Sequence, residues 1–187
     1  KGLRYLEIGT NDPVYINSTF NLYKGGARGV LVDPLPEVED LISMIRPEDR
    51  FVNAIVSDKS YDELITFYRS EKSVFSAIDK NRFDFFDNAG IINKDKYEVV
   101  QCRQVSVNEI LADMEESPNL LLVDAEGEDK SILMGIDYNQ YKIDMIVSEG
   151  YDEEMLTYLN SYGYEMVYVI DGNKNNIFVK NEYLRYF

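Results

Sequence analysis

The 187-residue sequence contains no histidine. Ser–His and Cys–His catalytic triads, histidine-ligated zinc and a histidine general base are therefore excluded. The single cysteine, Cys102, excludes an internal disulfide framework and a cysteine-rich metal site, and it fits a protein of the reducing cytoplasm. Any proton transfer must fall to aspartate, glutamate, tyrosine or lysine side chains.

Basic residues are scarce as well, because 19 Lys and Arg stand against 34 Asp and Glu, for a formal net charge of −15. Such a field repels a polyanion, so a nucleic-acid partner is not expected. No apolar run approaches the length of a membrane span. The length suits one α/β domain over residues 1–187. The sequence enters an apolar run at Leu3 without an initiator methionine, and we expect it to be part of a longer chain.

Short apolar runs alternate with helical patterns along most of the sequence. Apolar strands linked by helical crossovers predict a mostly parallel sheet that is covered by helices on both faces. The last two strand patterns surround a turn rich in Gly and Asn, which is typical of an antiparallel hairpin. We therefore expect an α/β fold with strands at 3–8, 29–34, 50–56, 119–128 and 142–150 and a closing hairpin within 163–180.

Capping residues predict where the helices begin and end. Asp12 is the expected N-cap of a helix that ends at Gly25-Gly26. Ser106 and Glu109 form a capping box before a clearly amphipathic helix. Helical spacing of apolar residues also occurs over 38–45, at Ile132 and Leu133, and over 155–159.

Residues 57–96 form a long polar segment whose secondary structure is ambiguous. Segments of this length are seldom structureless inside a compact domain, so we expect a lid or a substrate-binding insertion. The aromatic side chains of the segment either stack on a bound molecule or form a satellite core beneath the lid. They are Tyr61, Phe67, Tyr68, Phe75, Phe83, Phe85 and Phe86.

The segment YLEIGTNDPV, residues 5–14, reads as a strand that runs into a turn with one glycine. A diphosphate site requires G-x-G-x-x-G, so that backbone N–H groups can approach the phosphates. Here Gly9 has no second or third glycine, Asp12 places a carboxylate where a phosphate would lie, and Pro13 removes an N–H. We expect this turn to exclude a diphosphate.

The same turn suits an adenosyl ligand that has no phosphate and carries a positive sulfur, such as S-adenosylmethionine. Gly9 lets the chain pass close to the amino-acid portion of that ligand. Glu7, Thr10 and Asn11 offer polar contacts. Asp33 ends the second strand, where an acid accepts hydrogen bonds from ribose hydroxyls. A turn that begins at Asp33 without any ligand is the alternative.

Three blocks of the sequence resemble the FkbM-type S-adenosylmethionine-dependent methyltransferases, at residues 5–36, 52–58 and 120–149. The D-x-E-G motif within LLLVDAEGEDKSILMG is the most specific of them, and the hairpin at 163–180 also looks like the last hairpin of the family. Pro13 departs from the family, since many members have glycine there, and this departure suggests a sub-branch.

The resemblance implies a Rossmann-like seven-stranded methyltransferase fold. It also implies O-methylation of a small polar acceptor, often a sugar, in bacterial surface-glycan or natural-product pathways. Through the block VNAIVSD it adds Asn53 and Ala54 to the expected cofactor contacts, and through the D-x-E-G motif it adds Asp124.

Three acids are the candidate catalytic residues, since a hydroxyl must lose its proton during methyl transfer. Asp124 and Glu126 end the strand at 119–128, and Glu149 ends the next one. Because residues 124 and 126 share one face of an extended segment, we expect the three carboxylates to converge. They serve as a general base, or they bind Mg²⁺ or Mn²⁺, which prefer oxygen ligands. Acids there also simply complement the dipole of the following helix.

Two other functions stay open at this point. One is an enzyme that binds NAD or a nucleotide sugar, against which the crowded turn at Gly9 and the closing hairpin argue. The other is a non-catalytic methyltransferase-like module. The sequence leaves the oligomeric state open, and a homo-oligomer is compatible with it.

Overall fold

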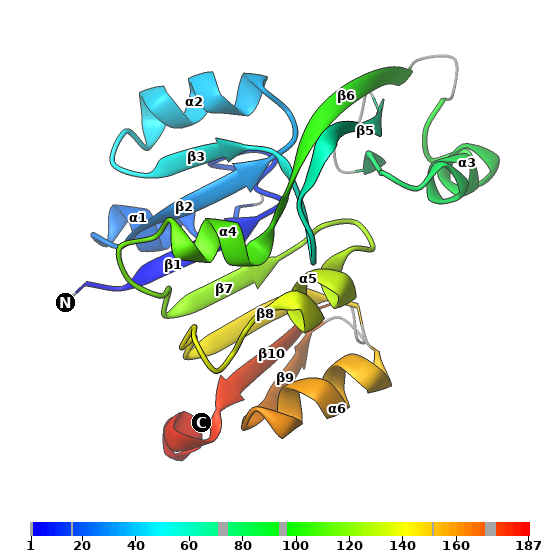
Figure 1. Cartoon of the computed structure of the whole chain (residues 1–187). Helices are drawn as coiled ribbons and strands as arrows, with labels where there is room; N and C mark the ends of the chain where they lie inside the picture. The colour runs from blue at the N-terminus through cyan, green and yellow to red at the C-terminus, as the bar shows by residue number, and fades with distance from the viewer. Residues whose placement is uncertain (1, 16, 71–74, 94–96, 151, 171–174) are drawn as a thin grey trace.

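The computed structural model describes residues 2–15, 17–70, 75–93, 97–150, 152–170 and 175–187. Its main sheet has seven strands in the order β3-β2-β1-β7-β8-β10-β9 (Figure 1). The first five run parallel, and β10 is antiparallel to both of its neighbours, β8 and β9. This arrangement confirms the predicted α/β fold, with its closing antiparallel strands. The strands are β1 (Arg4–Ile8), β2 (Arg28–Asp33), β3 (Arg50–Asn53), β7 (Leu120–Val123), β8 (Met145–Glu149), β9 (Tyr164–Ile170) and β10 (Asn175–Lys180).

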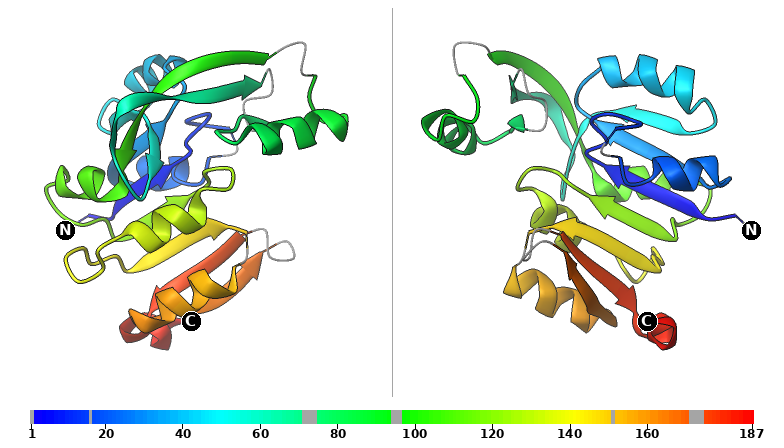
Figure 2. Two further views of the ribbon diagram at one scale, coloured as in Figure 1. Left: turned by 45° about the vertical axis from the view of Figure 1, so that its right-hand side comes forward. Right: turned by 180° about the vertical axis from the view of Figure 1, so that it is seen from behind.

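Helices cover both faces of this sheet (Figures 1 and 2). Successive residues of a strand point to opposite faces, and β1 illustrates the result. Leu6 and Ile8 join the buried cluster beneath α4, α5 and α6, whereas Tyr5 joins a second cluster with residues of α1 and α2. The helices are α1 (Phe20–Lys24), α2 (Glu37–Ile45), α4 (Val107–Ala112), α5 (Asp129–Gly135) and α6 (Glu153–Ser161), and the 3₁₀ helix η3 (Asn181–Tyr186) ends the chain.

The predicted helix from Asp12 to Gly25-Gly26 is wrong over its first half, because α1 begins only at Phe20. The Asp12 carboxylate caps a local turn instead, accepting the N–H groups of Val14 and Tyr15 at 2.8 and 2.7 Å. Asn17 takes the capping role at α1, since its side-chain oxygen accepts the Phe20 N–H at 2.8 Å. Polar tertiary contacts of the intervening segment, described below, override its helical pattern.

The predicted strand at 50–56 divides at Ala54 into two strands of different sheets. β3 belongs to the main sheet, while β4 (Ile55–Ser57) belongs to a second sheet of order β4-β6-β5. The ambiguous segment supplies β5 (Tyr61–Ser70) and α3 (Lys80–Asn88), and β6 (Tyr97–Ser106) follows it. Figure 1 shows this second sheet and α3 extending beyond the carboxyl ends of β1 and β2.

The helix at Ser106 is as predicted, because the Ser106 hydroxyl accepts the Glu109 N–H at 3.1 Å. The second hydrogen bond of the predicted capping box would run from the Ser106 N–H to the Glu109 side chain. The Ser106 N–H donates instead to the Ser60 hydroxyl at 2.8 Å. In the described ranges, every helix is too short or too polar to cross a membrane.

Candidate functional site

A pocket of about 190 Å³ opens at the carboxyl ends of β1, β2 and β7. The chain moves from β1 outward to β2 and β3, and it returns to the other side of β1 at β7, so β1 lies at the point where the strand order reverses. Ligands of open parallel sheets bind at such a point. Phe67 of β5 and residues 76–78 also line the pocket, so the second sheet contributes one of its walls.

The turn after β1 accepts only glycine at position 9. Gly9 has a φ of 85°, and an added Cβ would lie 1.8 Å from the Asp124 carbonyl oxygen. Close backbone contacts hold this arrangement, since the Asp124 N–H donates to the Ile8 carbonyl at 2.9 Å. The glycine therefore serves the close approach of β1 and β7.

The backbone donors of this turn are already used within the protein. The N–H groups of Gly9 and Thr10 donate to the Val32 carbonyl at 2.9 and 3.2 Å. The next one, of Asn11, donates to the Asp33 carboxylate at 2.7 Å. A phosphate-binding turn instead offers its N–H groups to the ligand. The turn thus lacks the free donors that a diphosphate requires.

Asp33 is a buried carboxylate in the pocket wall, and only 4% of its surface is exposed. Each of its oxygens accepts one backbone N–H, from Asn11 at 2.7 Å and from Leu35 at 2.9 Å. Burial raises the pKa of Asp33 to about 6, although these two hydrogen bonds lower it. A carboxylate oxygen that accepts one hydrogen bond still has a lone pair for a second.

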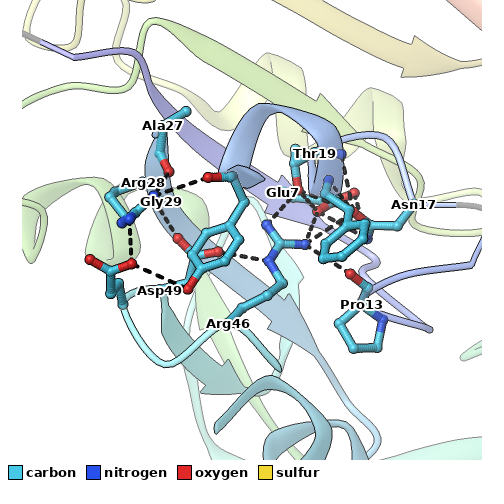
Figure 3. Close-up of polar contacts among 12 residues, drawn as sticks. Glu7, Pro13, Asn17, Thr19, Ala27, Arg28, Gly29, Arg46 and Asp49 are labelled. Atoms are coloured by element: carbon cyan, nitrogen blue, oxygen red, sulfur yellow. Dashed lines mark hydrogen bonds and ion pairs between the residues drawn. The ribbon is translucent and has the colours of Figure 1, made fainter. Parts of the chain in front are cut away.

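Thr10 and Glu7 are the other buried polar groups of the pocket wall. The Thr10 hydroxyl, 3% exposed as a residue, has no hydrogen-bond partner among the described residues. Buried polar atoms are almost always paired, so this hydroxyl is suited to a ligand contact. Glu7 accepts the Thr19 hydroxyl at 2.5 Å and the Asn17 amide at 3.2 Å (Figure 3). Its burial raises the pKa of the Glu7 carboxyl.

Oxygens of Asp124, Glu126 and Glu149 lie within 4.8 Å of one another, so the three predicted acids converge. The expected reason is wrong, because β7 ends at Val123 and the chain is not extended beyond it. Glu126 has a φ of 48° and Gly127 one of 107°, so a left-handed turn directs the Glu126 side chain. Asp124 and Glu126 line the pocket, and Glu149 lies beside them outside its lining.

Asp129 is a buried carboxylate that the sequence pattern did not indicate as part of the site. Its oxygens accept the N–H groups of Ala125 at 3.2 Å and Glu149 at 3.0 Å, and so they tie the turn after β7 to the end of β8. Burial, and then the charges of Asp124 and Glu149, raise the pKa of Asp129 to about 7. Its place in the first turn of α5 made it look like an acid that only complements the helix dipole.

Asn53 and six of the seven aromatic residues named for the segment 57–96 lie outside the pocket lining. Asn53 is exposed and outside the lining, where its amide donates to the Asp33 carbonyl at 3.0 Å, whereas Ala54 lines the pocket. Of the seven aromatic residues, only Phe67 lines it. Most of the others pack against aromatic rings, as in the pairs Tyr68–Phe83 and Phe75–Phe86, and Tyr61 and Phe85 are exposed.

The charge of the pocket has one sign. Five carboxylates line it, and no lysine or arginine does so among the residues that the structure describes. Such a wall attracts a cationic ligand and repels phosphates. The five are Glu7, Asp33, Asp124, Glu126 and Glu128.

The strand order defines a Rossmann-like α/β fold, with a pocket at the reversal point, where proteins of this architecture bind their ligands. The chain belongs to the methyltransferase FkbM domain family, whose family model matches residues 7–166. It is therefore a methyltransferase, as the sequence resemblance implied.

Solved structures that are similar to the chain include two methyltransferases. A TehB-like SAM-dependent methyltransferase from Corynebacterium glutamicum is 16% identical, with a TM-score of 0.47, over 96% of this chain and 81% of that one. A precorrin-6y C5,15-methyltransferase from Geobacter metallireducens is 12% identical, with a TM-score of 0.45, over 95% of this chain and 80% of that one. No protein with a curated description matches the sequence.

Proposed function

We propose that the protein is an S-adenosylmethionine-dependent O-methyltransferase that acts on a hydroxyl of a small polar acceptor, such as a sugar or a glycan or natural-product precursor. The observation that carries this proposal is the acidic pocket at the reversal point of the sheet, whose described lining has no basic side chain. S-adenosylmethionine is a cation at its sulfur and has no phosphate, so it suits this pocket where NAD does not.

The residues of the pocket fit the parts of this donor. Asp33 would accept hydrogen bonds from the ribose hydroxyls, and Ala54 with its apolar neighbours would contact the adenine. Glu7, Asn11 and the unpaired Thr10 hydroxyl would hold the amino-acid portion. Gly9 allows the close approach of the backbone there.

The three converging acids would act on the acceptor. When bound, S-adenosylmethionine supplies an electrophilic methyl group on a positive sulfur. A hydroxyl attacks it well only if its proton has an acceptor, and carboxylates are the available groups in a chain without histidine. Oxygens of the three carboxylates lie within 4.8 Å of one another, and two of these residues line the donor pocket. We therefore propose that the cluster of Asp124, Glu126 and Glu149 accepts the proton of the acceptor hydroxyl. The same cluster is the candidate site for Mg²⁺ or Mn²⁺.

We place the reaction in the bacterial cytoplasm, in keeping with the single Cys102. The second sheet and α3 would close over the acceptor as a lid, since Phe67 and residues 76–78 reach the donor pocket.

Calorimetry with three ligands tests the proposal. We expect S-adenosylmethionine and its demethylated product, S-adenosylhomocysteine, to bind, and NAD not to bind. Binding of NAD alone would assign the pocket to a dinucleotide, and binding of none of the three would favour a non-catalytic module.

Asp33→Ala is expected to weaken donor binding by about 1–3 kcal/mol, roughly 5- to 150-fold in Kd, because a charged hydrogen-bond acceptor is lost.

The pKa of Asp33, about 6, adds a pH dependence to donor binding. Above that pH the wild-type carboxylate is ionised and accepts the ribose hydroxyls, so affinity should fall as the pH drops through 6. Asp33→Asn should remove this dependence. Titrations at several pH values, with the exposed Asp40→Ala as control, check both points. An unchanged Kd in Asp33→Ala would refute the placement.

A further inference from the structure

Arg46 follows α2 directly and is fully buried, and each of its five N–H donors has an acceptor (Figure 3). Its Nε donates to Asp49 at 2.8 Å. The two terminal nitrogens reach strand β1 and the segment 13–19, which connects the Gly9 turn to α1. Their acceptors are the Pro13 carbonyl at 3.3 Å, the Asn17 side-chain oxygen at 3.0 Å, the Tyr5 hydroxyl at 2.8 Å and the Thr19 hydroxyl at 2.7 Å.

These contacts determine the direction of the hydrogen bonds that reach Glu7. The Thr19 hydroxyl accepts from Arg46, so its own proton is donated to Glu7. The Asn17 side-chain oxygen accepts from Arg46 and from the Phe20 N–H, so its NH₂ group faces Glu7. Both neighbours therefore present donors to the Glu7 carboxylate.

The charges of this cluster leave a negative excess on the pocket side. Arg46 forms a fully buried ion pair with Asp49, and its nearest nitrogen lies 3.9 Å from Glu7. One positive and two negative groups are thus buried together. The unbalanced negative charge is that of Glu7, which lines the pocket. Its neighbours in the lining, Asp33 and Asp124, are also acids and do not neutralise it. A cationic group of a ligand would complete the balance.

We propose that Arg46 is a positioning residue for the methyl donor, which acts through Thr19 and Asn17 to hold the Glu7 carboxylate toward the ammonium group of the donor. Arg46 itself does not line the pocket. The inference rests on the proposed function, since it needs a donor with an amino-acid portion. It goes beyond that function because it states that Arg46, which lies directly after α2 and outside the pocket, increases the affinity for the donor.

The test compares two ligands that differ in the group facing Glu7. S-adenosylhomocysteine carries the amino-acid portion, and methylthioadenosine lacks it while keeping the adenosyl group. Thr19→Val removes the hydroxyl between Arg46 and Glu7 with little change of volume, and Thr19→Ser retains a hydroxyl. Arg46→Met tests the guanidinium directly. Arg28→Met is the matched control, because Arg28 pairs with Glu48 and makes no contact with Glu7.

We expect Thr19→Val and Arg46→Met to raise the Kd of S-adenosylhomocysteine about tenfold or more, the scale of a lost charged contact. The Kd of methylthioadenosine should change by less than about twofold. Thr19→Ser, which keeps a hydroxyl, should retain most of the wild-type affinity for S-adenosylhomocysteine. Arg46→Met leaves Asp49 buried and unpaired and can fail to fold, which thermal unfolding would reveal, so Thr19→Val carries the test if it does.

Three results would overturn the inference. Equal losses for both ligands in Thr19→Val would reduce the network to a structural role, and an unchanged affinity for S-adenosylhomocysteine would remove the role altogether. In either case a wild-type protein that binds S-adenosylhomocysteine leaves the proposed function intact. A wild-type protein that binds neither ligand would overturn both.

Discussion

Glu149→Gln is expected to lower kcat while leaving the donor Kd nearly unchanged, because Glu149 lies outside the lining of the donor pocket. An amide keeps the shape of the side chain but takes up no proton, so the variant that removes the general base should lose roughly 10²–10⁴-fold in kcat. Asp124→Asn and Glu126→Gln should lower kcat and also weaken donor binding, because both residues line the donor pocket. The measurement is the rate of S-adenosylhomocysteine formation, with an acceptor found by screening neutral and aminated sugars.

Two controls separate proton transfer from other roles of these acids. Glu165→Gln removes an exposed carboxylate of β9 that lies outside the pocket lining, and it should leave the rate unchanged. EDTA should also leave the wild-type rate unchanged, because a carboxylate base needs no metal. A rate that EDTA abolishes and Mg²⁺ or Mn²⁺ restores would assign the three carboxylates to a metal ion instead. Full activity in all three amide variants would exclude the cluster from the reaction.

Gly9→Ala should destabilise the protein by about 4 kcal/mol or more and abolish donor binding. A residue with a side chain at a positive φ costs roughly 1–2 kcal/mol by itself. The larger part arises because the new Cβ would lie 1.8 Å from the Asp124 carbonyl, so β1 and β7 must separate at the floor of the pocket. Urea unfolding and donor calorimetry measure the two effects.

Gly26→Ala is the matched control for this prediction. Gly26 has a φ of 96°, similar to that of Gly9, but an added Cβ would meet nothing within 4 Å. It should therefore show only the conformational cost, and the difference between the two variants measures the steric contact. Equal destabilisation by the two substitutions would contradict the role assigned to the strand approach at Gly9.

The main sheet was largely predictable because its signals are local. Each of the five apolar runs contains a strand of the main sheet, although the run at 50–56 divides and the run at 119–128 stops being a strand after Val123. The closing hairpin and the helix capped by Ser106 occur where the sequence indicates them. The second sheet was not predictable in the same way, because β4 and β6 pair across almost fifty residues of chain and β5 joins them only through β6. Nothing in the apolar run at 50–56 indicates that it divides at Ala54. The division arises because β3 pairs with β2 and β4 pairs with β6.

The candidate site shows a similar mixture. Gly9, Asp33, Asp124 and Glu126 lie in the pocket because the carboxyl ends of adjacent parallel strands meet at one edge. The convergence of Glu126 with Glu149 depends on a left-handed turn that no strand pattern predicts. Asp129 was missed because its partners, Ala125 and Glu149, belong to two different strand ends.

The sequence by itself determined the chemistry that is open to this protein: no histidine, an excess of acid, and a single-glycine turn that disfavours phosphate. Those properties depend on residue type and on neighbours in the chain. Only the tertiary structure decided that Arg46 is buried against residues 5–19, and that this contact replaces the first half of a predicted helix. A guanidinium with five donors requires acceptors when it leaves water, and the folded chain supplies them from β1, the segment before α1, and Asp49.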